Sequence, residues 1–200
     1  MSQPILSVLI PTVIGRERSF GSLIDEFRSQ IGAYDLFDVV EVMVARDNKE
    51  ITIGKKRENL YKFAKGLYSV QWDDDDFIHP KGLQLIVDAL KSNPEIPCVT
   101  YKESCMMNGI YKSSNHSITY FQWMDNSDGY DYVRCPFYKD VIRTDIARLV
   151  PFPDIRYNED EQWSMALREF LNAEIHINEE VYHYIYNETN HNERYGLDRG

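Results

Sequence analysis

A short apolar segment runs directly into four consecutive aspartates in the stretch Leu67-Tyr68-Ser69-Val70-Gln71-Trp72-Asp73-Asp74-Asp75-Asp76. Four carboxylates at the end of a buried strand repel one another strongly, and a divalent cation would relieve that repulsion. Hard cations such as Mg²⁺ and Mn²⁺ prefer carboxylate oxygens and often share them with phosphate groups. The run therefore predicts a site for a metal ion and a diphosphate, with a solvated acidic turn as the alternative.

The composition is that of a globular chain with a sizeable core. It has 200 residues, of which 43% are hydrophobic, and we expect a single domain over residues 1–200. The net charge of −10 argues against a surface built mainly for nucleic-acid backbones. Three cysteines without a Cys-x-x-Cys pair favour reduced thiols and a cytoplasmic protein. The N-terminus has no basic leader, and we expect no membrane span.

Strand-like and helix-like segments alternate through the first half of the chain. Compact apolar runs predict buried strands, and apolar residues at helical spacing predict helices between them. The predicted strands are Ile5–Ile10, Val39–Val44, Leu67–Trp72 and Pro97–Tyr101, and the predicted helices cover Phe20–Ile31, about 55–67 and about 83–90. This alternation predicts an α/β fold with a mostly parallel central sheet and helices on both faces.

Three of these strands end in polar residues. They lead into Pro11-Thr12, Arg46-Asp47-Asn48 and Asp73–Asp76. Ligands of parallel sheets bind beyond the carboxyl ends of the strands, so we expect these three ends to meet at one site.

The second half of the chain lacks this regular alternation of strands and helices. Residues 101–132 are rich in Tyr, Ser, Asn and Met and predict hairpins and loops, with a strand-like piece at Ser117–Trp123. A short helix is expected around Lys139–Leu149, and another opens at Asn158 with a buried face that extends to Leu171. One or two strands are expected over Glu174–Tyr186.

These segments resemble the family 2 glycosyltransferases, which have the GT-A fold, over roughly residues 5–190. The apolar run that ends in Pro11 and Thr12 is similar to the family's first strand. The run that ends in Asp47 is similar to its second strand, whose terminal acid contacts the nucleotide base, although only one acid is present here. Lys56-Arg57-Glu58-Asn59 resembles a segment whose basic residues, here Arg57, face the donor's phosphates.

The acidic run fits the family's metal motif, Asp-x-Asp-Asp-x-x-x-Pro, through to Pro80. The resemblance implies that Asp73 approaches the ribose or the metal, that Asp74 belongs to the donor-binding residues, and that Asp75 ligates Mn²⁺ or Mg²⁺ on the diphosphate. Many members place a further histidine ligand near the C-terminus. His191 is our expected ligand, His183 is the alternative, and His79 is a candidate for supporting the metal ligands.

Asn158-Glu159-Asp160-Glu161 resembles the family's Glu-Asp motif at a helix N-terminus, which implies that Asp160 is the general base. Acids in the first helical turn also stabilise the helix dipole, which is the structural alternative. A base opposite the leaving group predicts inversion at the anomeric carbon.

The implied activity is that of a hexosyltransferase that uses a nucleoside-diphosphate sugar, with UDP as the default nucleotide. The expected acceptor is a glycan or another hydroxyl-bearing molecule, with a modified DNA base as a variant. Trp123 and Tyr130 are candidates for stacking on sugars, and Arg134 and Lys139 for meeting an anionic acceptor.

Two other functions fit parts of the pattern. A sugar-phosphate nucleotidyltransferase has a similar fold, but its first strand runs into a glycine-rich basic loop, for which Gly15-Arg16 is a poor match. A non-catalytic module that binds nucleotide sugars or glycans would need no base, so turnover of a donor separates it from the enzyme.

Overall fold

The computed structural model describes residues 3–186 of the chain. Its helices are α1 (Glu17–Ala33), α2 (Ile53–Phe63), α3 (Gly82–Ser92), α4 (Thr144–Ala147) and α5 (Glu159–Arg168). Its strands are β1 (Leu6–Val13), β2 (Val40–Asp47), β3 (Tyr68–Gln71), β4 (Phe77–Ile78), β5 (Cys98–Met107), β6 (Ile110–His116), β7 (Met124–Ser127), β8 (Tyr130–Arg134), β9 (Val141–Arg143) and β10 (Glu174–Tyr186). No helix among the described residues is both long and apolar enough to cross a membrane.

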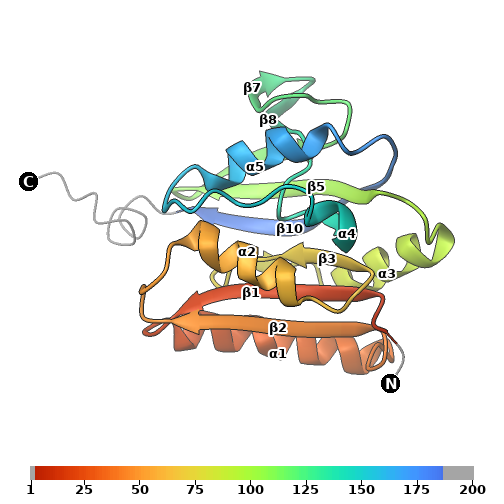
Figure 1. Cartoon of the computed structure of the whole chain (residues 1–200). Coiled ribbons are helices and arrows are strands. Elements are labelled where there is room, and N and C mark those ends of the chain that lie inside the picture. Colours follow the sequence, from red (N-terminus) through yellow and green to blue (C-terminus); the bar gives the residue numbers. More distant parts are fainter. Residues whose placement is uncertain (1–2, 187–200) are drawn as a thin grey trace, which may run out of the picture.

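All the strands belong to one sheet. Its order is β2-β1-β3-β9-β5-β6-β8-β7, and β10 lies beside β5 and also pairs with the short β4. The first three strands run parallel to one another, as do β5 and β10, whereas β9 runs antiparallel between β3 and β5. Figure 1 shows the arrowheads of β1 and β2 at the same edge of the sheet, where α2 begins.

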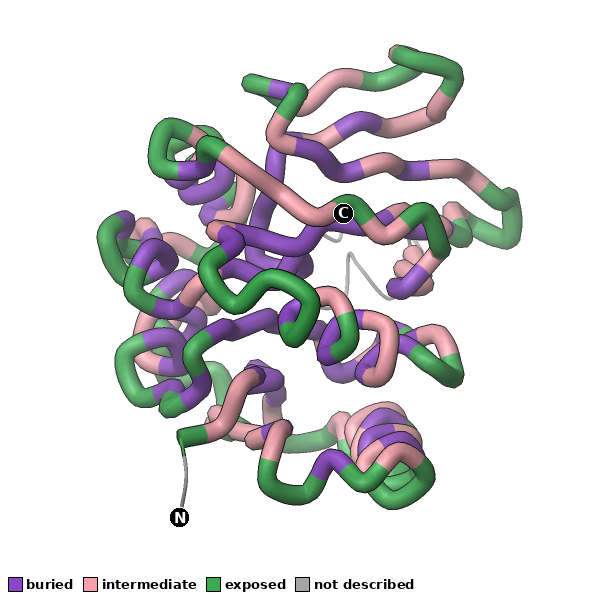
Figure 2. The backbone as a smooth tube through the Cα atoms, turned by 90° about the vertical axis from the view of Figure 1, so that its right-hand side faces the viewer, coloured by how far each residue is buried: buried purple, intermediate pink, exposed green. Residues whose placement is uncertain are grey.

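Helices cover both faces of this sheet, as the sequence predicts. Alternate residues of a strand point to opposite faces. In β1, Val8 and Ile10 join a core cluster with α1 and α3, while Leu9 joins a second cluster with α2, α4 and α5. Both clusters are buried, and Figure 2 shows buried backbone through the middle of the molecule and a more exposed outer hairpin, β7–β8.

The helix α2 is joined to α5 by a stack of three aromatic rings. Tyr61 of α2 stacks on Trp163 of α5 with ring centroids 5.4 Å apart, and Phe152 stacks on both. Gly54, in the first turn of α2, has no room for a side chain, because an added Cβ would lie 1.8 Å from the carbonyl oxygen of Pro153. This close approach sets the start of α2 against the loop that leads to α5.

Three predictions for the second half were wrong. The segment expected as a helix at Lys139–Leu149 begins as strand β9, because the β-branched Val141 and Ile142 fill a buried place between β3 and β5; only α4 is helical. Residues 117–123 form turns rather than a strand. The last helix ends at Arg168, so Phe170 lies beyond it and is half exposed.

Candidate functional site

A cavity of about 1200 Å³ lies beyond the carboxyl ends of β1 and β3. The end of β1 contributes Pro11 and Thr12, and the acidic segment, Asp73–Asp76, contributes all four of its residues. Six basic side chains line the remaining walls: Arg16, Arg18, Lys49, Lys56, Arg57 and Arg156. The cavity therefore brings acidic and basic groups together at the edge where ligands of parallel sheets bind.

The residues of the acidic segment alternate in exposure, although all four line the cavity. Asp73 and Asp75 remain partly exposed, whereas Asp74 and Asp76 are buried. The buried pair is held from two different parts of the fold, Asp74 by the end of β1 and Asp76 by β10. Asp73 and Asp75 thus carry the more accessible carboxylates of the segment.

Few polar contacts compensate for the burial of the Asp74 carboxylate. Its Oδ2 accepts a hydrogen bond from the Thr12 hydroxyl at 2.5 Å, and its Oδ1 forms an ion pair with Arg16 at the same distance. Among the described residues Oδ1 has no hydrogen-bond donor. Burial raises the pKa of Asp74 to about 6, although Arg16 and Thr12 oppose the shift.

Asp76 fixes the end of the segment to β10. Its two carboxylate oxygens accept from the Tyr182 hydroxyl at 2.6 Å and from the backbone N–H of Ile185 at 2.9 Å. The same hydroxyl accepts from the backbone N–H of Asp73 at 3.1 Å. Burial raises the pKa of Asp76. Asp76 and Tyr182 are therefore structural supports of the turn.

Arg57 is the centre of a buried ionic network. Its Nη2 donates to Asp73 at 3.0 Å and its Nε to Glu159 at 3.1 Å, and its guanidinium lies 3.5 Å from the ring centre of Tyr138. The Tyr138 hydroxyl donates to the second oxygen of Asp73 at 2.8 Å. Burial favours the neutral form of the guanidinium, but these carboxylates hold the pKa of Arg57 well above its usual value.

Lys56 connects the ends of the first two strands. Its ammonium group donates to the carbonyl oxygen of Thr12 at 2.8 Å and to the carboxylate of Asp47. Partial burial opposes ionisation of Asp47, but the hydrogen bonds from Lys56 and from the backbone of Ile51 hold its pKa below the usual value. Asp47 is not among the residues that line the cavity, but it is hydrogen-bonded to Lys56, which is.

Asp160 stands in the first turn of α5, directly after Glu159, and is partly exposed. One of its oxygens accepts from the backbone N–H of Glu161 at 2.9 Å. It is close enough to the centre of the network to raise the pKa of Arg57 by its charge. The Glu-Asp motif and the acidic segment are therefore neighbours, joined by Arg57, although Asp160 does not itself line the cavity.

The histidines predicted as metal ligands are not confirmed. His191 lies outside the described residues. His183 lies on β10, where its Nδ1 is 2.5 Å from the Ser104 hydroxyl, and it does not line the cavity. The Nδ1 of His79 accepts from the backbone of Lys81 at 3.1 Å.

Residues 3–186 hold no cluster of three or more His, Cys, Asp or Glu side chains arranged to bind a metal. The donor set nevertheless fits a hard cation. Asp73 and Asp75 offer carboxylate oxygens at the cavity wall, and Asp74 offers a buried oxygen without a hydrogen-bond donor. Mg²⁺ commonly takes one or two carboxylates and completes its shell with phosphate oxygens and water.

Lys139 is not available to an acceptor, contrary to expectation. It is buried, and its ammonium group donates to Glu103 at 2.8 Å. Glu103 and Asp140 flank the buried His116, whose two ring nitrogens lie 2.9 Å and 3.1 Å from their oxygens. Because Lys139 helps to stabilise this buried network, its role is structural.

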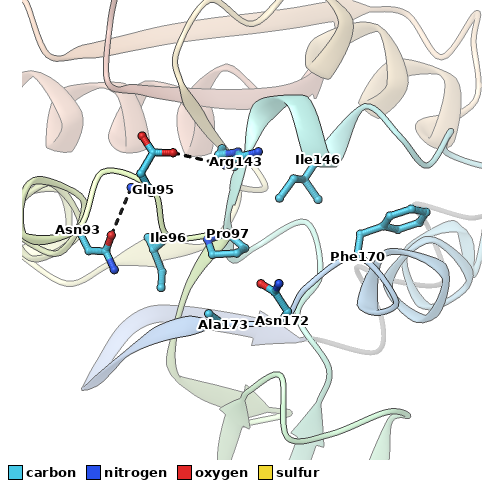
Figure 3. Close-up of a pocket in the computed structure, with 9 residues that line it drawn as sticks. All are labelled: Asn93, Glu95, Ile96, Pro97, Arg143, Ile146, Phe170, Asn172 and Ala173. Atoms are coloured by element: carbon cyan, nitrogen blue, oxygen red, sulfur yellow. Dashed lines mark hydrogen bonds and ion pairs between the residues drawn. The ribbon is translucent and has the colours of Figure 1, made fainter.

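A second cavity, of about 420 Å³, lies at the opposite edge of the sheet, near the starts of β5 and β10. Figure 3 shows Arg143 directed toward Glu95 above Pro97 and Ala173. Arg143 also forms a two-point ion pair with Asp145 at 2.7 Å and 2.9 Å. The charge of Arg143 is thus already compensated.

Several residues that build the site escaped sequence reasoning. The sequence marks Arg16 only as part of a poor phosphate loop, yet it pairs with both Asp74 and Asp75. Tyr138 and Tyr182 support the acidic segment from distant strands and loops. No local pattern marks such contacts, because Arg16 lies 58 residues before Asp74, and Tyr138 and Tyr182 lie 65 and 109 residues after Asp73.

No protein-family model matches the chain, and no curated protein is a significant sequence match. Solved structures do match its fold. TarS of S. aureus (residues 1–349) in complex with UDP superposes with a TM-score of 0.64 at 15% identity, and the match covers 94% of this chain and 62% of that one. Its complex with UDP-GlcNAc gives a TM-score of 0.63, with coverage of 92% and 59%.

The mannosyltransferase PcManGT of Pyrobaculum calidifontis, in complex with GDP-Man and Mn²⁺, superposes with a TM-score of 0.58 at 13% identity. That match covers 94% of this chain and 59% of the other. This chain has the GT-A fold. It spans about three fifths of the length of these chains.

Proposed function

We propose that this chain is a metal-dependent glycosyltransferase of the family 2 type, which moves a sugar from a nucleoside-diphosphate donor to an acceptor hydroxyl. The observation that carries the proposal is the cavity at the carboxyl edge of the sheet, where Asp73 and Asp75 face basic side chains. A metal ion bound to a diphosphate matches this lining, because the metal is attracted to the aspartates and the phosphates to the basic side chains. The cavity's volume of about 1200 Å³ slightly exceeds the roughly 300–1000 Å³ of ordinary ligand pockets.

The GT-A neighbours support a nucleotide-sugar donor. TarS binds UDP and UDP-GlcNAc, and PcManGT binds GDP-Man together with Mn²⁺. We therefore propose a UDP-sugar as the first donor to test and a GDP-sugar as the second. Transfer of a hexose is the reaction type that these two donors share.

The proposed donor contacts follow the cavity walls. Asp75 is the proposed metal ligand, with Asp73 beside it and His191 as a further ligand. A bound divalent cation supplies Lewis-acid stabilisation of the charge that develops on the leaving diphosphate. Pro11, Thr12, Asp47 and Asp74 are proposed to surround the nucleotide. Arg57 is proposed to hold Asp73 in place while it faces the phosphates.

Asp160 is the proposed general base. A carboxylate that accepts the acceptor's proton during attack must lie beside the donor, and the Arg57 network sets the start of α5 next to the acidic segment. Attack on the face opposite the diphosphate inverts the anomeric carbon. The proposed acceptor is a glycan or another hydroxyl-bearing molecule.

The test is a screen of nucleotide sugars for release of the nucleoside diphosphate with Mn²⁺ and with a chelator. We expect release from at least one donor with Mn²⁺, its loss with chelator, and its loss in Asp75→Asn. Asp88→Asn is the matched control, because Asp88 is an exposed aspartate of α3. Metal-independent release, or release that survives Asp75→Asn, would contradict the proposal. A donor that binds without turnover would favour the binding module.

A further inference from the structure

Arg16 bridges two neighbouring carboxylates of the acidic segment. Its Nη1 lies 2.5 Å from Oδ1 of Asp74, and its Nη2 forms an ion pair with Oδ2 of Asp75. The Asp74 side chain is fully buried, whereas those of Arg16 and Asp75 are 25% and 22% exposed. A cation that belongs to the chain itself therefore occupies the space between two carboxylates at the cavity wall.

The negative charge on the buried Asp74 carboxylate requires compensation. Oδ2 of Asp74 accepts from Thr12, but Oδ1 has no hydrogen-bond donor in the described part of the chain and is compensated by Arg16 alone. A buried carboxylate without hydrogen bond or counterion is strongly unfavourable. If Arg16 leaves, another cation or a proton must neutralise Asp74 in its place.

Arg16 is placed so that it can leave. It follows Gly15, which has a positive φ of 96° and open space around it, and it precedes the first turn of α1. Its side chain makes no capping hydrogen bond to the helix. The guanidinium lines the same cavity as the proposed diphosphate site, and guanidinium groups bind phosphate oxygens through two parallel hydrogen bonds.

We propose that Arg16 is an exchangeable counterion, which holds Asp74 and Asp75 in the ligand-free protein and moves onto the donor's diphosphate when a divalent cation replaces it. This inference rests on the proposed function. Such an exchange makes metal binding weak without nucleotide and strong with nucleotide, because the donor's diphosphate attracts the Arg16 guanidinium, which otherwise competes with the metal. By linkage, the metal strengthens nucleotide binding by the same factor.

The test measures Mn²⁺ binding to the full chain by the electron paramagnetic resonance signal of free Mn²⁺, with and without UDP. Without UDP, Arg16→Gln is expected to bind Mn²⁺ about tenfold more tightly than the unmodified chain, equivalent to about 1.4 kcal/mol. Arg16→Lys should lie between the two, because an ammonium group cannot bridge both carboxylates as the planar guanidinium does. The factor by which UDP tightens Mn²⁺ binding should fall in Arg16→Gln.

Arg18→Gln is the matched control. Arg18 lines the same cavity and has no ion pair with any described carboxylate, so its loss changes the net charge without freeing Asp74 or Asp75. In the measurement without UDP, where no phosphate contacts the basic wall, screening by salt should keep its effect on Mn²⁺ affinity within about twofold. An equal gain in Arg16→Gln and Arg18→Gln would mean that general charge, not exchange, sets the affinity, and would overturn the inference.

Two further outcomes separate this inference from the proposed function. If the unmodified chain binds Mn²⁺ in the presence of UDP, but Arg16→Gln binds Mn²⁺ alone no more tightly than the unmodified chain, exchange is wrong and the metal-dependent function stands. If none of the variants binds Mn²⁺ with or without UDP, the proposed function fails and the inference fails with it. Thermal unfolding of each variant checks that it is folded.

Discussion

The guanidinium of Arg57 donates to the carboxylate of Glu159 at 3.1 Å across 102 residues of sequence. The same guanidinium donates to Asp73 at 3.0 Å. One buried side chain therefore holds the proposed metal segment and the helix of the proposed base in a fixed relation. The stack of Tyr61 on Trp163 fixes the two helices on either side of this contact.

Replacing Arg57 should damage both stability and activity. Arg57→Met leaves Asp73 and Glu159 without their shared cation, and loss of one partner from a buried pair costs about 3–5 kcal/mol. Arg57→Lys keeps the charge but cannot donate in two directions through a planar group, so it should fold and transfer poorly. Chemical denaturation and donor turnover measure the two effects. Arg28→Lys, on the exposed face of α1, should change neither.

Asp160→Asn should remove transfer but keep donor binding. The amide cannot accept the acceptor's proton, and loss of a general base costs roughly 10²–10⁴-fold in rate. Steady-state turnover and the dissociation constant for UDP separate the two effects. Glu161→Gln makes the same chemical change one residue along the helix and should keep most of the activity. Transfer at an undiminished rate in Asp160→Asn would remove Asp160 from the role of base.

The close approach of α2 to the loop before α5 can be tested with a pair of alanines. In Gly54→Ala the new Cβ meets the backbone oxygen of Pro153, so α2 must shift. We expect a loss of about 1–3 kcal/mol in unfolding free energy and weaker donor binding, because Lys56 and Arg57 follow directly. Gly21→Ala in α1 has open space and should stabilise the protein by about 0.5–1 kcal/mol. Equal effects of the two variants on unfolding would contradict the described packing.

Stability should fall as the pH rises above about 6.5, and His116 should account for part of the fall. Burial disfavours the charged imidazole, but Asp140 and Glu103 outweigh it and raise the pKa of His116 from 6.5 to about 9. A group whose pKa is raised by folding stabilises the protein fully below its unfolded pKa, and this contribution is lost as the pH rises through the folded pKa.

Burial raises the pKa of Asp76 from 3.8 to about 8, so its contribution also falls with rising pH, but it falls from about pH 4 and is lost by about pH 8. The comparison with His116→Gln separates the two groups. Unfolding free energies measured from pH 6 to pH 10 should decline less steeply in His116→Gln than in the unmodified chain. Identical slopes would show that His116 is not charged in the folded protein.

The sequence predicts the architecture better than the site. Alternating apolar runs and helical periodicities are local, and they indicated both the parallel strands and the helices on each face. The four aspartates were recognisable because of their position after a buried strand. The alternation of exposed and buried aspartates could not be predicted. It depends on the hydrogen bonds of Thr12 to Asp74 and of Tyr182 to Asp76, which form only in the tertiary structure.

In the second half of the chain, local sequence patterns also failed to predict contacts between distant segments. Val141 and Ile142 lie in a stretch with helical spacing, but the gap between β3 and β5 draws them into a strand. Lys139 was a candidate for meeting an anionic acceptor, yet the buried Glu103 supplies its partner. Long-range pairing, rather than local propensity, decides the place of both residues.

The most direct test of the central claim is a crystal of the full chain grown with UDP and Mn²⁺, with diffraction recorded at a wavelength where manganese scatters anomalously. We predict an anomalous peak in contact with Asp75, with the diphosphate on its far side and its oxygens turned toward the basic wall of the cavity. Nucleotide bound elsewhere, or an acidic segment that faces solvent with no manganese beside it, would contradict the account.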